Sequence, residues 1–357
     1  MDKRILITGG AGFIGANLGL GLKERYRTCE IIAFDNLKRR GSELNVPRLQ
    51  RAGIRFVHGD VRNREDVIEG GLAPELILEC SAEPSVLAGY SSPEYMLNTN
   101  VLGTIHCLEL ARRHQADMIF LSTSRVYPVA LLNQLQTKET ATRLVLEEEQ
   151  GVPGCSSHGI SEDFPLTGAR SLYGATKLAS ELVMTEYAAA YGLRTIINRC
   201  GVITGPWQMG KVDQGVFALW VAAHYFGRSL SYIGHGGTGK QVRDLLHIAD
   251  FVDLIDLQIA RFDVLNGQVF NVGGGLSSSL SLQETTSLCR DLVGQQIDIG
   301  TILEDRAGDV KVFITDHRHV THCTGWRPQR EPRETLADIV DWMRASDSLV
   351  RPIFEGL

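Results

Sequence analysis

The sequence predicts an α/β fold in which a doubly wound parallel sheet is joined to a smaller C-terminal lobe. Three observations predict it. Short apolar runs alternate with helical patterns in the N-terminal part, a glycine cluster directly follows the first run, and the periodicity weakens beyond residue 205. Parallel strands need helix-length crossovers, so strands that alternate with helices build a doubly wound sheet.

The strands predicted for this sheet are short runs rich in aliphatic residues. In chain order they are Arg4–Ile7, Ile31–Phe34, Arg55–Val57, Leu76–Leu78, Met118–Leu121 and Thr195–Asn198. Several are followed by polar residues, at the carboxyl ends where a doubly wound sheet binds its ligands. Helical patterns lie between them, notably over 98–114 and from Tyr173 to about Tyr191.

The rest of the chain has a less regular pattern. The segment 128–170 is long, polar and irregular, and such a loop in a compact domain is usually functional or mobile. We expect 205–241 to be loop-rich, 244–260 to be helical, and 281–294 to form a helix that begins after Ser281. These returns of the chain would build the second lobe.

The composition of the 357 residues argues against several classes of protein. A net charge of −6 provides no general basic field, so we expect no nucleic-acid or membrane-surface binding, and any bound polyanion must meet local arginines. No apolar run approaches the roughly 20 residues of a spanning helix, and no signal pattern precedes the first strand, which favours a cytoplasmic protein. Seven cysteines show neither a CxxC pair nor metal-ligand spacing, so we expect reduced thiols and no metal.

The glycine cluster Gly9-x-x-Gly12-x-x-Gly15 follows a strand and opens a helix. Glycine here permits a tight turn and lets a pyrophosphate approach N–H groups at the positive helix end. Asp35 ends the second strand, where its carboxylate can accept hydrogen bonds from an adenosine ribose and would repel a 2′-phosphate. The motif predicts a Rossmann domain that binds NAD. The basic run 38–40 keeps NADP open, and an ordinary turn is the alternative reading of these residues.

Tyr173 and Lys177 lie at i and i+4 of a predicted helix, so they share one face. A phenol has a reference pKa of about 10, and a shift of about 3 units, worth about 4 kcal/mol, would half-ionise it at neutral pH. An adjacent ammonium and an oxidised nicotinamide ring can supply that shift. Thr123 or Ser124, at the end of a strand, can hydrogen-bond the same substrate oxygen. The alternatives are an ordinary aromatic–lysine pair and a hydroxyl that caps a turn.

With these motifs in place, the chain resembles the extended short-chain dehydrogenase/reductase family, and within it the nucleotide-sugar epimerases and dehydratases. The resemblance covers nearly the whole length. It is carried by TGGAGFIG at 8–15, FDNL at 34–37, HGDVRN at 58–63, NVLGT at 100–104, STSRVYP at 122–128, ISEDFP at 160–165, SLYGATK at 171–177, GKQVRDLLH at 239–247, FNVGGG at 270–275 and RAGDV at 306–310.

The resemblance implies roles for individual residues. Tyr173 would be the base, Lys177 would anchor the cofactor, and Thr123 rather than Ser124 would be the catalytic hydroxyl. The implied NAD contacts are Gly9, Gly12, Phe13, Ile14, Gly15, Asp35, Asn36, Asp60, Val61, Asn100 and Lys177. The implied contacts to a CDP- or UDP-linked sugar are Ser124, Arg125, Asp213, Gln214, Tyr232, Arg243 and Arg306, of which the last two would hold the diphosphate. Tyr232 reads equally well as an aromatic residue of the core.

The residues after Thr123 separate the reactions of this family. The 4,6-dehydratases follow the catalytic Thr with Asp-Glu, and the UDP-glucuronate decarboxylases typically have a Glu two positions after it, whereas this chain has Ser124 and Arg125. Oxidation and reduction at one carbinol remain, which favours an epimerase. The long insert after Pro128 and the run 239–244 look most like the CDP-paratose 2-epimerases. A UDP-hexose or UDP-hexuronate 4-epimerase, a dehydratase or oxidoreductase, and a binding protein without turnover are the alternatives.

The resemblance also implies a domain organisation. An NAD-binding Rossmann domain would comprise 1–197 and 241–273, and a nucleotide-sugar-binding lobe would comprise 198–240 and 274–357. Members of the family often pair through a four-helix contact, so we expect a homodimer.

Overall fold

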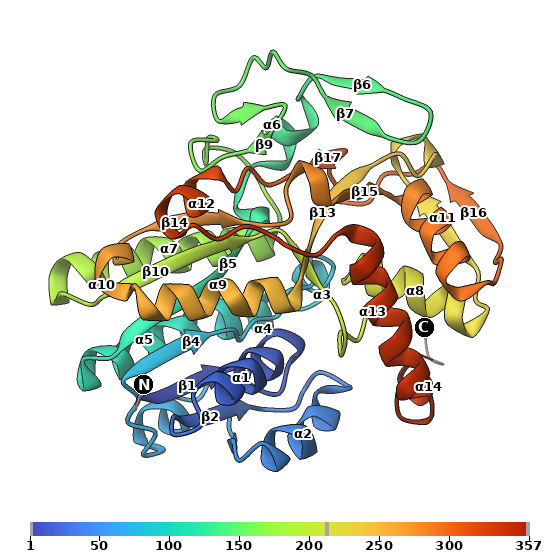
Figure 1. Cartoon of the computed structure of the whole chain (residues 1–357). Helices are drawn as coiled ribbons and strands as arrows, with labels where there is room; N and C mark the ends of the chain where they lie inside the picture. The colour runs from blue at the N-terminus through green and yellow to red at the C-terminus, as the bar shows by residue number, and fades with distance from the viewer. Residues whose placement is uncertain (1–2, 211–213, 355–357) are drawn as a thin grey trace. The chain divides into compact units, whose positions relative to one another are not determined.

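The computed structural model describes residues 3–210 and 214–354, and the chain divides into two compact units (Figure 1). The first unit comprises Met1–Val126, Leu172–Arg199 and Val252–Phe270, and the second comprises Tyr127–Ser171, Cys200–Phe251 and Asn271–Leu357. This division differs from the sequence-based boundaries chiefly in grouping Tyr127–Ser171 with the second unit. Which unit binds which ligand stays a prediction.

A seven-stranded sheet forms the centre of the first unit. Its strands are β1 (Arg4–Thr8), β2 (Glu30–Asp35), β3 (Arg55–His58), β4 (Leu76–Glu79), β5 (Asp117–Thr123), β10 (Thr195–Cys200) and β14 (Val269–Val272). The strand order is β14-β10-β5-β4-β1-β2-β3, and the pairs from β5 to β3 are parallel. All six strands predicted for the sheet are confirmed. The order reverses between β1 and β4, which makes their carboxyl ends the switch point of a doubly wound fold.

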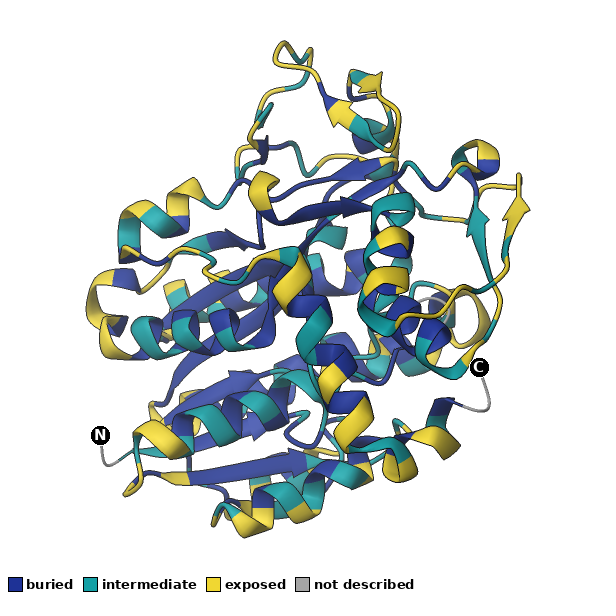
Figure 2. Cartoon of the chain, turned by 45° about the vertical axis from the view of Figure 1, so that its right-hand side comes forward, coloured by how far each residue is buried: buried dark blue, intermediate teal, exposed yellow. Residues whose placement is uncertain are grey.

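Both faces of this sheet are covered, so its strands read as continuous apolar runs. Figure 2 shows these strands largely buried, and Ile5, Leu6 and Ile7 of β1 are fully buried. One face packs against α5 (Gly103–His114) and α7 (Leu172–Tyr191). On the other face, α1 (Phe13–Arg25) lies against Ile7 and against α9 (Ile248–Ala260).

The predicted helices of this unit are confirmed, with one irregularity. The helix predicted over 98–114 consists of a π-helical turn, Asn98–Leu102, followed by α5. The short helices are α2 (Val46–Arg51), α3 (Ala88–Ser91), α4 (Pro93–Leu97) and α10 (Phe262–Leu265).

The second unit is built from small sheets and a helical cluster. Strand β13 (Val242–His247) pairs with β11 (Val202–Thr204), β15 (Ser279–Ser281) and β17 (Val312–Phe313), and β12 (Leu230–Ile233) pairs with β16 (Ile299–Ile302). The helices are α8 (Val216–Phe226), α11 (Leu282–Val293), α12 (Arg318–Thr324), α13 (Pro332–Ala345) and α14 (Asp347–Phe354), and α8, α11 and α13 pack together.

Two predictions for the segments beyond residue 205 are confirmed only in part. The segment 205–241 is not merely loop-rich, because it contains α8 and β12. Helix α8 is buried from Phe217 to His224, so it has no polar face to produce a helical period. The segment 244–260 begins as the end of strand β13, because an apolar strand that runs directly into a helix cannot be separated from it by periodicity. The helix after Ser281 is confirmed, and Ser281 and Glu284 form a capping box at its start.

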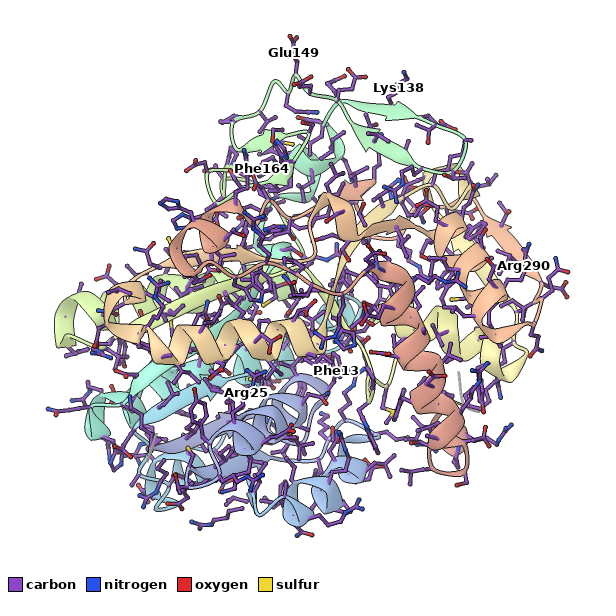
Figure 3. All side chains as sticks on the ribbon, viewed as in Figure 1. Phe13, Arg25, Lys138, Glu149, Phe164 and Arg290 are labelled. Carbon is purple, nitrogen blue, oxygen red and sulfur yellow. The ribbon has the colours of Figure 1, made fainter. Side chains whose placement is uncertain are left out.

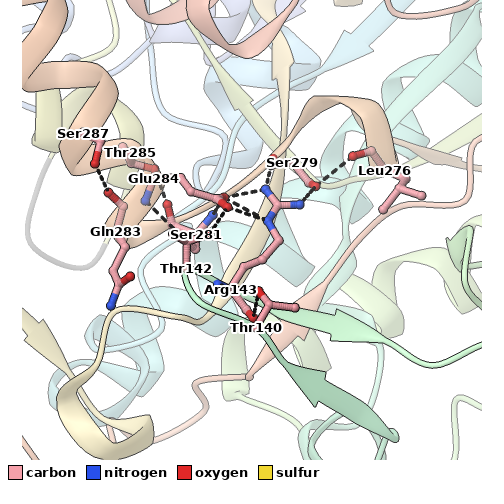
Figure 4. Close-up of polar contacts among 10 residues, drawn as sticks. All are labelled: Thr140, Thr142, Arg143, Leu276, Ser279, Ser281, Gln283, Glu284, Thr285 and Ser287. Carbon is pink, nitrogen blue, oxygen red and sulfur yellow. Dashed lines mark hydrogen bonds and ion pairs between the residues drawn. The ribbon is translucent and has the colours of Figure 1, made fainter.

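The irregular insert 128–170 contains α6 (Val129–Asn133) and two small hairpins, β6–β7 (Thr137–Glu139 and Leu144–Leu146) and β8–β9 (Cys155–Ser156 and Gly159–Ile160). Lys138 and Glu149 point away from the insert into solvent (Figure 3). Arg143 fastens the first hairpin to α11, because its guanidinium donates to both carboxylate oxygens of Glu284 and to Ser279 (Figure 4).

The seven cysteines, all within the described residues, form no disulfide with one another. Over residues 3–210 and 214–354, no helix has the length and apolar character needed to cross a bilayer.

Candidate active site

The turn between β1 and α1 is shaped by close backbone contacts that only glycine permits. Gly9 has a φ of +62°, and its carbonyl oxygen accepts from the Gly12 N–H at 3.0 Å. A Cβ at Gly15 would lie 2.3 Å from the Gly9 oxygen, and a Cβ at Gly10 would lie 2.6 Å from the Ala33 Cα. The sequence motif missed the role of Gly10, which lets the turn pack against β2.

This turn fits a dinucleotide pyrophosphate. The N-cap of α1 is Gly12, so no N-cap side chain occupies the N–H groups of the first helical turn. Phe13 and Ile14 form that turn and are half-buried. A helix N-terminus with open N–H groups and no side chain in the way is the arrangement that anionic phosphates require.

Asp35 and Asp60 lie at the ends of neighbouring strands. The Asp35 carboxylate accepts from the N–H groups of Ala11 at 3.1 Å and Leu37 at 2.8 Å. Burial raises the pKa of the Asp35 carboxyl, and these backbone donors partly offset that rise. Asn36 donates to Asp60 at 2.9 Å. The two predicted adenosine-binding acids are therefore brought to one edge of the sheet.

Arg62 stabilises the ionised form of Asp60. Its guanidinium and backbone N–H donate to both Asp60 oxygens at 2.6–3.1 Å. Burial alone would raise the pKa of Asp60, but the hydrogen bonds from Arg62 and Asn36 lower it to about 2. Val61 is buried, and its carbonyl oxygen lies 2.8 Å from His106 Nδ1.

Asn100 is fully buried and joins two segments of the candidate cofactor site. It accepts from the Glu83 N–H at 2.8 Å and donates to the Glu83 carbonyl at 3.1 Å and to Thr176 Oγ1 at 3.0 Å. Asn100 thus ties the loop after β4 to α7, the helix that carries Tyr173 and Lys177.

The candidate catalytic residues come from a strand end and a helix that pack together. Thr123 is the last residue of β5, and its Oγ1 accepts from the Arg125 N–H at 3.2 Å. Tyr173 and Lys177 lie in the first half of α7, which packs against β5 and against the 3₁₀ turn Ser124–Val126. Tyr173 is half-buried and Lys177 is 2% exposed.

Lys177 has two partners that the sequence did not predict. Its Nζ lies 3.6 Å from Glu79 Oε2 and 3.8 Å from the centroid of the Phe120 ring. Glu79 is fully buried, and Ser81 donates to its Oε1 at 2.6 Å. The only available signal was a carboxylate that ends the apolar run Leu76–Leu78.

A second buried ion pair was also missed. The Arg199 guanidinium donates to both Glu181 oxygens at 2.8–3.2 Å, and Ser122, which precedes Thr123, donates to the same carboxylate. Arg199 is 7% exposed and Glu181 4%. This pair links β10, α7 and β5 behind the candidate hydroxyl.

The remaining substrate candidates lie in the second unit. The Arg243 guanidinium donates to Asp309 Oδ1 at 2.7 Å and to the Val310 carbonyl at 2.6 Å. Arg306 lies three residues before Asp309 and is half-buried. Asp309 is not among the substrate contacts expected from the sequence, although it lies in the motif 306–310.

Three further candidates of this unit remain: Tyr232, Gln214 and Asp213. Tyr232 donates to Thr286 Oγ1 at 2.9 Å, and its ring packs against Gly239. Gln214 lies half-buried just before α8, and Asp213 lies outside the described residues. Among residues 3–210 and 214–354, no three His, Cys, Asp or Glu side chains are grouped to hold a metal.

Comparisons with known proteins show the family of the chain. A model of the NAD dependent epimerase/dehydratase family matches residues 5–273. The chain is 31% identical over 353 residues to CDP-paratose 2-epimerase of Salmonella typhi, covering 95% of this chain and 98% of that protein.

Solved structures share the fold along nearly the whole chain. UDP-glucose 4-epimerase of Thermus thermophilus, in complex with NAD, has a TM-score of 0.77 at 25% identity and covers 96% of this chain and 99% of its own. dTDP-glucose 4,6-dehydratase of Bacillus anthracis str. Ames, in complex with NAD, has a TM-score of 0.75 at 27% identity and covers 98% and 99%. The similar proteins therefore include both epimerases and a dehydratase.

Proposed function

The chain belongs to the NAD dependent epimerase/dehydratase family, whose cofactor is NAD, and from this premise we propose that it is an epimerase of a nucleotide-diphosphate sugar. The observation that carries the proposal is the end of β5, where Thr123 is followed by Ser124 and Arg125 and by no carboxylate. Elimination of water needs an acid beside the hydroxyl, whereas reversible oxidation of a carbinol does not.

In the proposed reaction a proton is transferred twice, first from the sugar hydroxyl and then back to it. When bound, NAD accepts and later returns a hydride. Tyr173 Oη takes the proton of the sugar hydroxyl as the carbinol becomes a ketone and gives it back on reduction. The Lys177 ammonium favours the phenolate, and the Thr123 hydroxyl donates to the reacting oxygen. Between oxidation and reduction the ketone flips over and presents its other face. The configuration at the reacting carbon therefore inverts, and the net redox change is zero.

The buried carboxylates of the first unit do not supply the missing acid. Glu181 is bound by Arg199 and Ser122, and Glu79 is paired with Lys177. Both are within 4% of full burial and already hold a cation. This arrangement favours an epimerase over the dehydratase alternative.

We propose that the chain acts as CDP-paratose 2-epimerase does, because that relative is 31% identical over 95% of this chain. Arg243 and Arg306 are proposed to hold the diphosphate, with Asp309 orienting Arg243 in the absence of substrate. Gln214, Tyr232 and the residues after Thr123 remain proposed sugar and base contacts. A UDP-hexose or UDP-hexuronate 4-epimerase is the second candidate, since a 4-epimerase shares the fold at 25% identity.

A homodimer and a cytoplasmic location complete the proposal. Large apolar side chains are exposed on the helices of the first unit: Tyr90 63%, Leu97 45%, Leu102 39% and Leu182 62%. Helices α4 and α5 both pack against α7, so these side chains are available to a second copy of the chain. Seven cysteines that form no disulfide with one another suit a reducing compartment.

The test is conversion of CDP- and UDP-linked sugars by the purified protein without added cofactor, with the stereochemistry of the product followed by NMR. We expect inversion at one carbon, and loss of at least about a hundredfold in rate for Tyr173→Phe. A requirement for stoichiometric NAD would exclude the epimerase, and full activity of Tyr173→Phe would exclude the assigned base. Elution as a monomer in light scattering would exclude the dimer.

A further inference from the structure

Glu79 stands at the switch point of the large sheet. It is the last residue of β4, and its register partners are Thr8 of β1 and Phe120 of β5. The Cys80 N–H donates to the Thr8 carbonyl, so β1 enters the glycine turn directly beside Glu79. A carboxylate at this position lies where a doubly wound fold places its ligands, yet neither the cofactor chemistry nor the proton transfer described above uses it.

The side chain of Glu79 is directed at Lys177. Ser81 occupies Oε1 with a hydrogen bond of 2.6 Å, whereas Oε2 makes no hydrogen bond within the described part of the chain and lies 3.6 Å from the Lys177 ammonium. The separation of 3.6 Å is that of an ion pair rather than a hydrogen bond. The pair therefore holds the ammonium in place and leaves its N–H donors to other acceptors.

Both ions are buried away from bulk solvent. Glu79 is 0% exposed and Lys177 2% exposed. A buried ammonium is stabilised only by groups within the protein, and here these are one carboxylate and the face of Phe120, which attracts cations. These two partners thus stabilise the charge of Lys177 and hold its long, flexible side chain in one orientation.

We propose that Glu79 is a positioning residue for the reaction, holding the Lys177 ammonium at the cofactor and limiting how strongly this cation favours the Tyr173 phenolate. The inference rests on the proposed roles of Lys177 and Tyr173. Each part has its own physical basis: the ion pair fixes the place of the cation, and the negative charge offsets part of its field.

The titratable groups around the pair support this assignment. Burial raises the pKa of Glu79, and the Lys177 charge and the Ser81 hydrogen bond act against that rise, so the carboxylate depends on its partner. Cys107 of α5 is a further titratable group that faces the pair, and burial raises its pKa well above its usual value. That thiol stays neutral, so the charge at this place is determined by Glu79 and Lys177.

Two substitutions separate the two parts of the proposal. Glu79→Gln removes the charge and keeps a polar side chain of nearly the same shape beside the ammonium, whereas Glu79→Leu removes both the charge and the polar atoms. Glu181→Gln is the matched control, because it removes the charge of another buried carboxylate of the same unit without touching Lys177. Thermal unfolding of each variant establishes that it folds.

Two readouts need no turnover. NAD affinity is measured by calorimetry, and the ionisation of Tyr173 is measured from the near-ultraviolet tyrosinate absorbance against the Tyr173→Phe variant in the presence of NAD. For Glu79→Gln we expect NAD affinity within about threefold and Tyr173 ionisation, with the acidic limb of the pH–rate profile, lower by about one pH unit. For Glu79→Leu we expect NAD affinity about tenfold weaker, and for Glu181→Gln a lower melting temperature with neither readout changed.

Unchanged tyrosine ionisation in Glu79→Gln would overturn the electrostatic part, and unchanged NAD affinity in a folded Glu79→Leu would overturn the positioning part. If Glu79→Leu does not fold, Glu79→Ala with the same affinity measurement decides the second part. Failure of every sugar to be converted would contradict the proposed function and leave both readouts measurable, so the two failures are distinguishable.

Discussion

The attachment of the insert to the second unit leads to a prediction that can be measured locally. Arg143 lies in the turn of the hairpin β6–β7, and its guanidinium contacts both oxygens of Glu284 on α11 (Figure 4). Removing this pair should let the hairpin open while the rest of the unit stays folded, because most of the hairpin is exposed and few buried apolar contacts hold it.

The magnitude follows from the burial of the pair. A hydrogen bond to a charged group contributes about 1.5–3 kcal/mol when it is buried. The side chains of Arg143 and Glu284 are 22% and 23% exposed, so solvent screening reduces the coupling to about 1–2 kcal/mol. Such a coupling corresponds to about 5- to 30-fold faster hydrogen exchange of the hairpin amides.

The assay is a double-mutant cycle of Arg143→Ala and Glu284→Gln, read by hydrogen exchange of the peptide that spans the hairpin. Gln keeps one carbonyl oxygen that can accept from the Ser281 N–H in the capping box, while the charge is removed and the oxygen that faces Thr142 and Arg143 becomes an NH₂ donor. Glu139→Gln is the control, because its carboxylate is 63% exposed and its pair with Lys240 should contribute little. A coupling energy near zero, or an equal effect of the control, would refute the reasoning.

The same cycle has a defined pH dependence. Burial tends to raise the pKa of Glu284, but the hydrogen bonds from Arg143, Ser281 and Thr142 and the charge of Arg143 together outweigh it, so the pKa is lowered. A carboxyl whose folded pKa is lowered contributes stability above its unfolded value of about 4.3 and loses it as the pH falls through the folded value. The coupling should therefore shrink below about pH 4.

Three further changes test other parts of the structure. Gly15→Ala places a Cβ 2.3 Å from the Gly9 oxygen, so we expect NAD binding at least about tenfold weaker by calorimetry, and an unchanged affinity would contradict the tight turn. Asp250→Asn removes the charge of a fully buried carboxylate that is paired with Arg330, so we expect the free energy of unfolding to fall by about 2–4 kcal/mol. An unchanged melting temperature would contradict this expectation. Burial raises the pKa of Asp244 to about 6, so the folded chain holds its proton longer than the unfolded chain and loses stability as the pH rises from about 4 to 6. The stability of Asp244→Asn relative to the native chain should therefore rise by an amount on the order of 3 kcal/mol over that range, and a constant difference would show that Asp244 is not responsible.

The strands and the glycine turn of the first unit were predictable because their signals are local. A buried parallel strand is an unbroken apolar run, and Gly9, Gly12 and Gly15 mark a turn whose geometry admits no other residue at its tightest points. The capping box at Ser281 is likewise a pattern of four neighbouring residues. Helix α8 was not predicted, because it lacks such a local signal. It is buried along most of its length, so its sequence has no polar face that would show a helical period.

The sequence by itself determined the fold class, the cofactor and the family, because these depend on residues close together in the chain or on motifs in a fixed order. Only the tertiary structure decided what surrounds the candidate lysine. Glu79 and Lys177 are far apart in sequence, and the ion pair exists because β4 and β5 are neighbours beneath α7. The attachment of Arg143 to Glu284 depends in the same way on packing. Buried charge pairs of this kind carry no local signal, since their stabilisation arises from a partner that folding brings near.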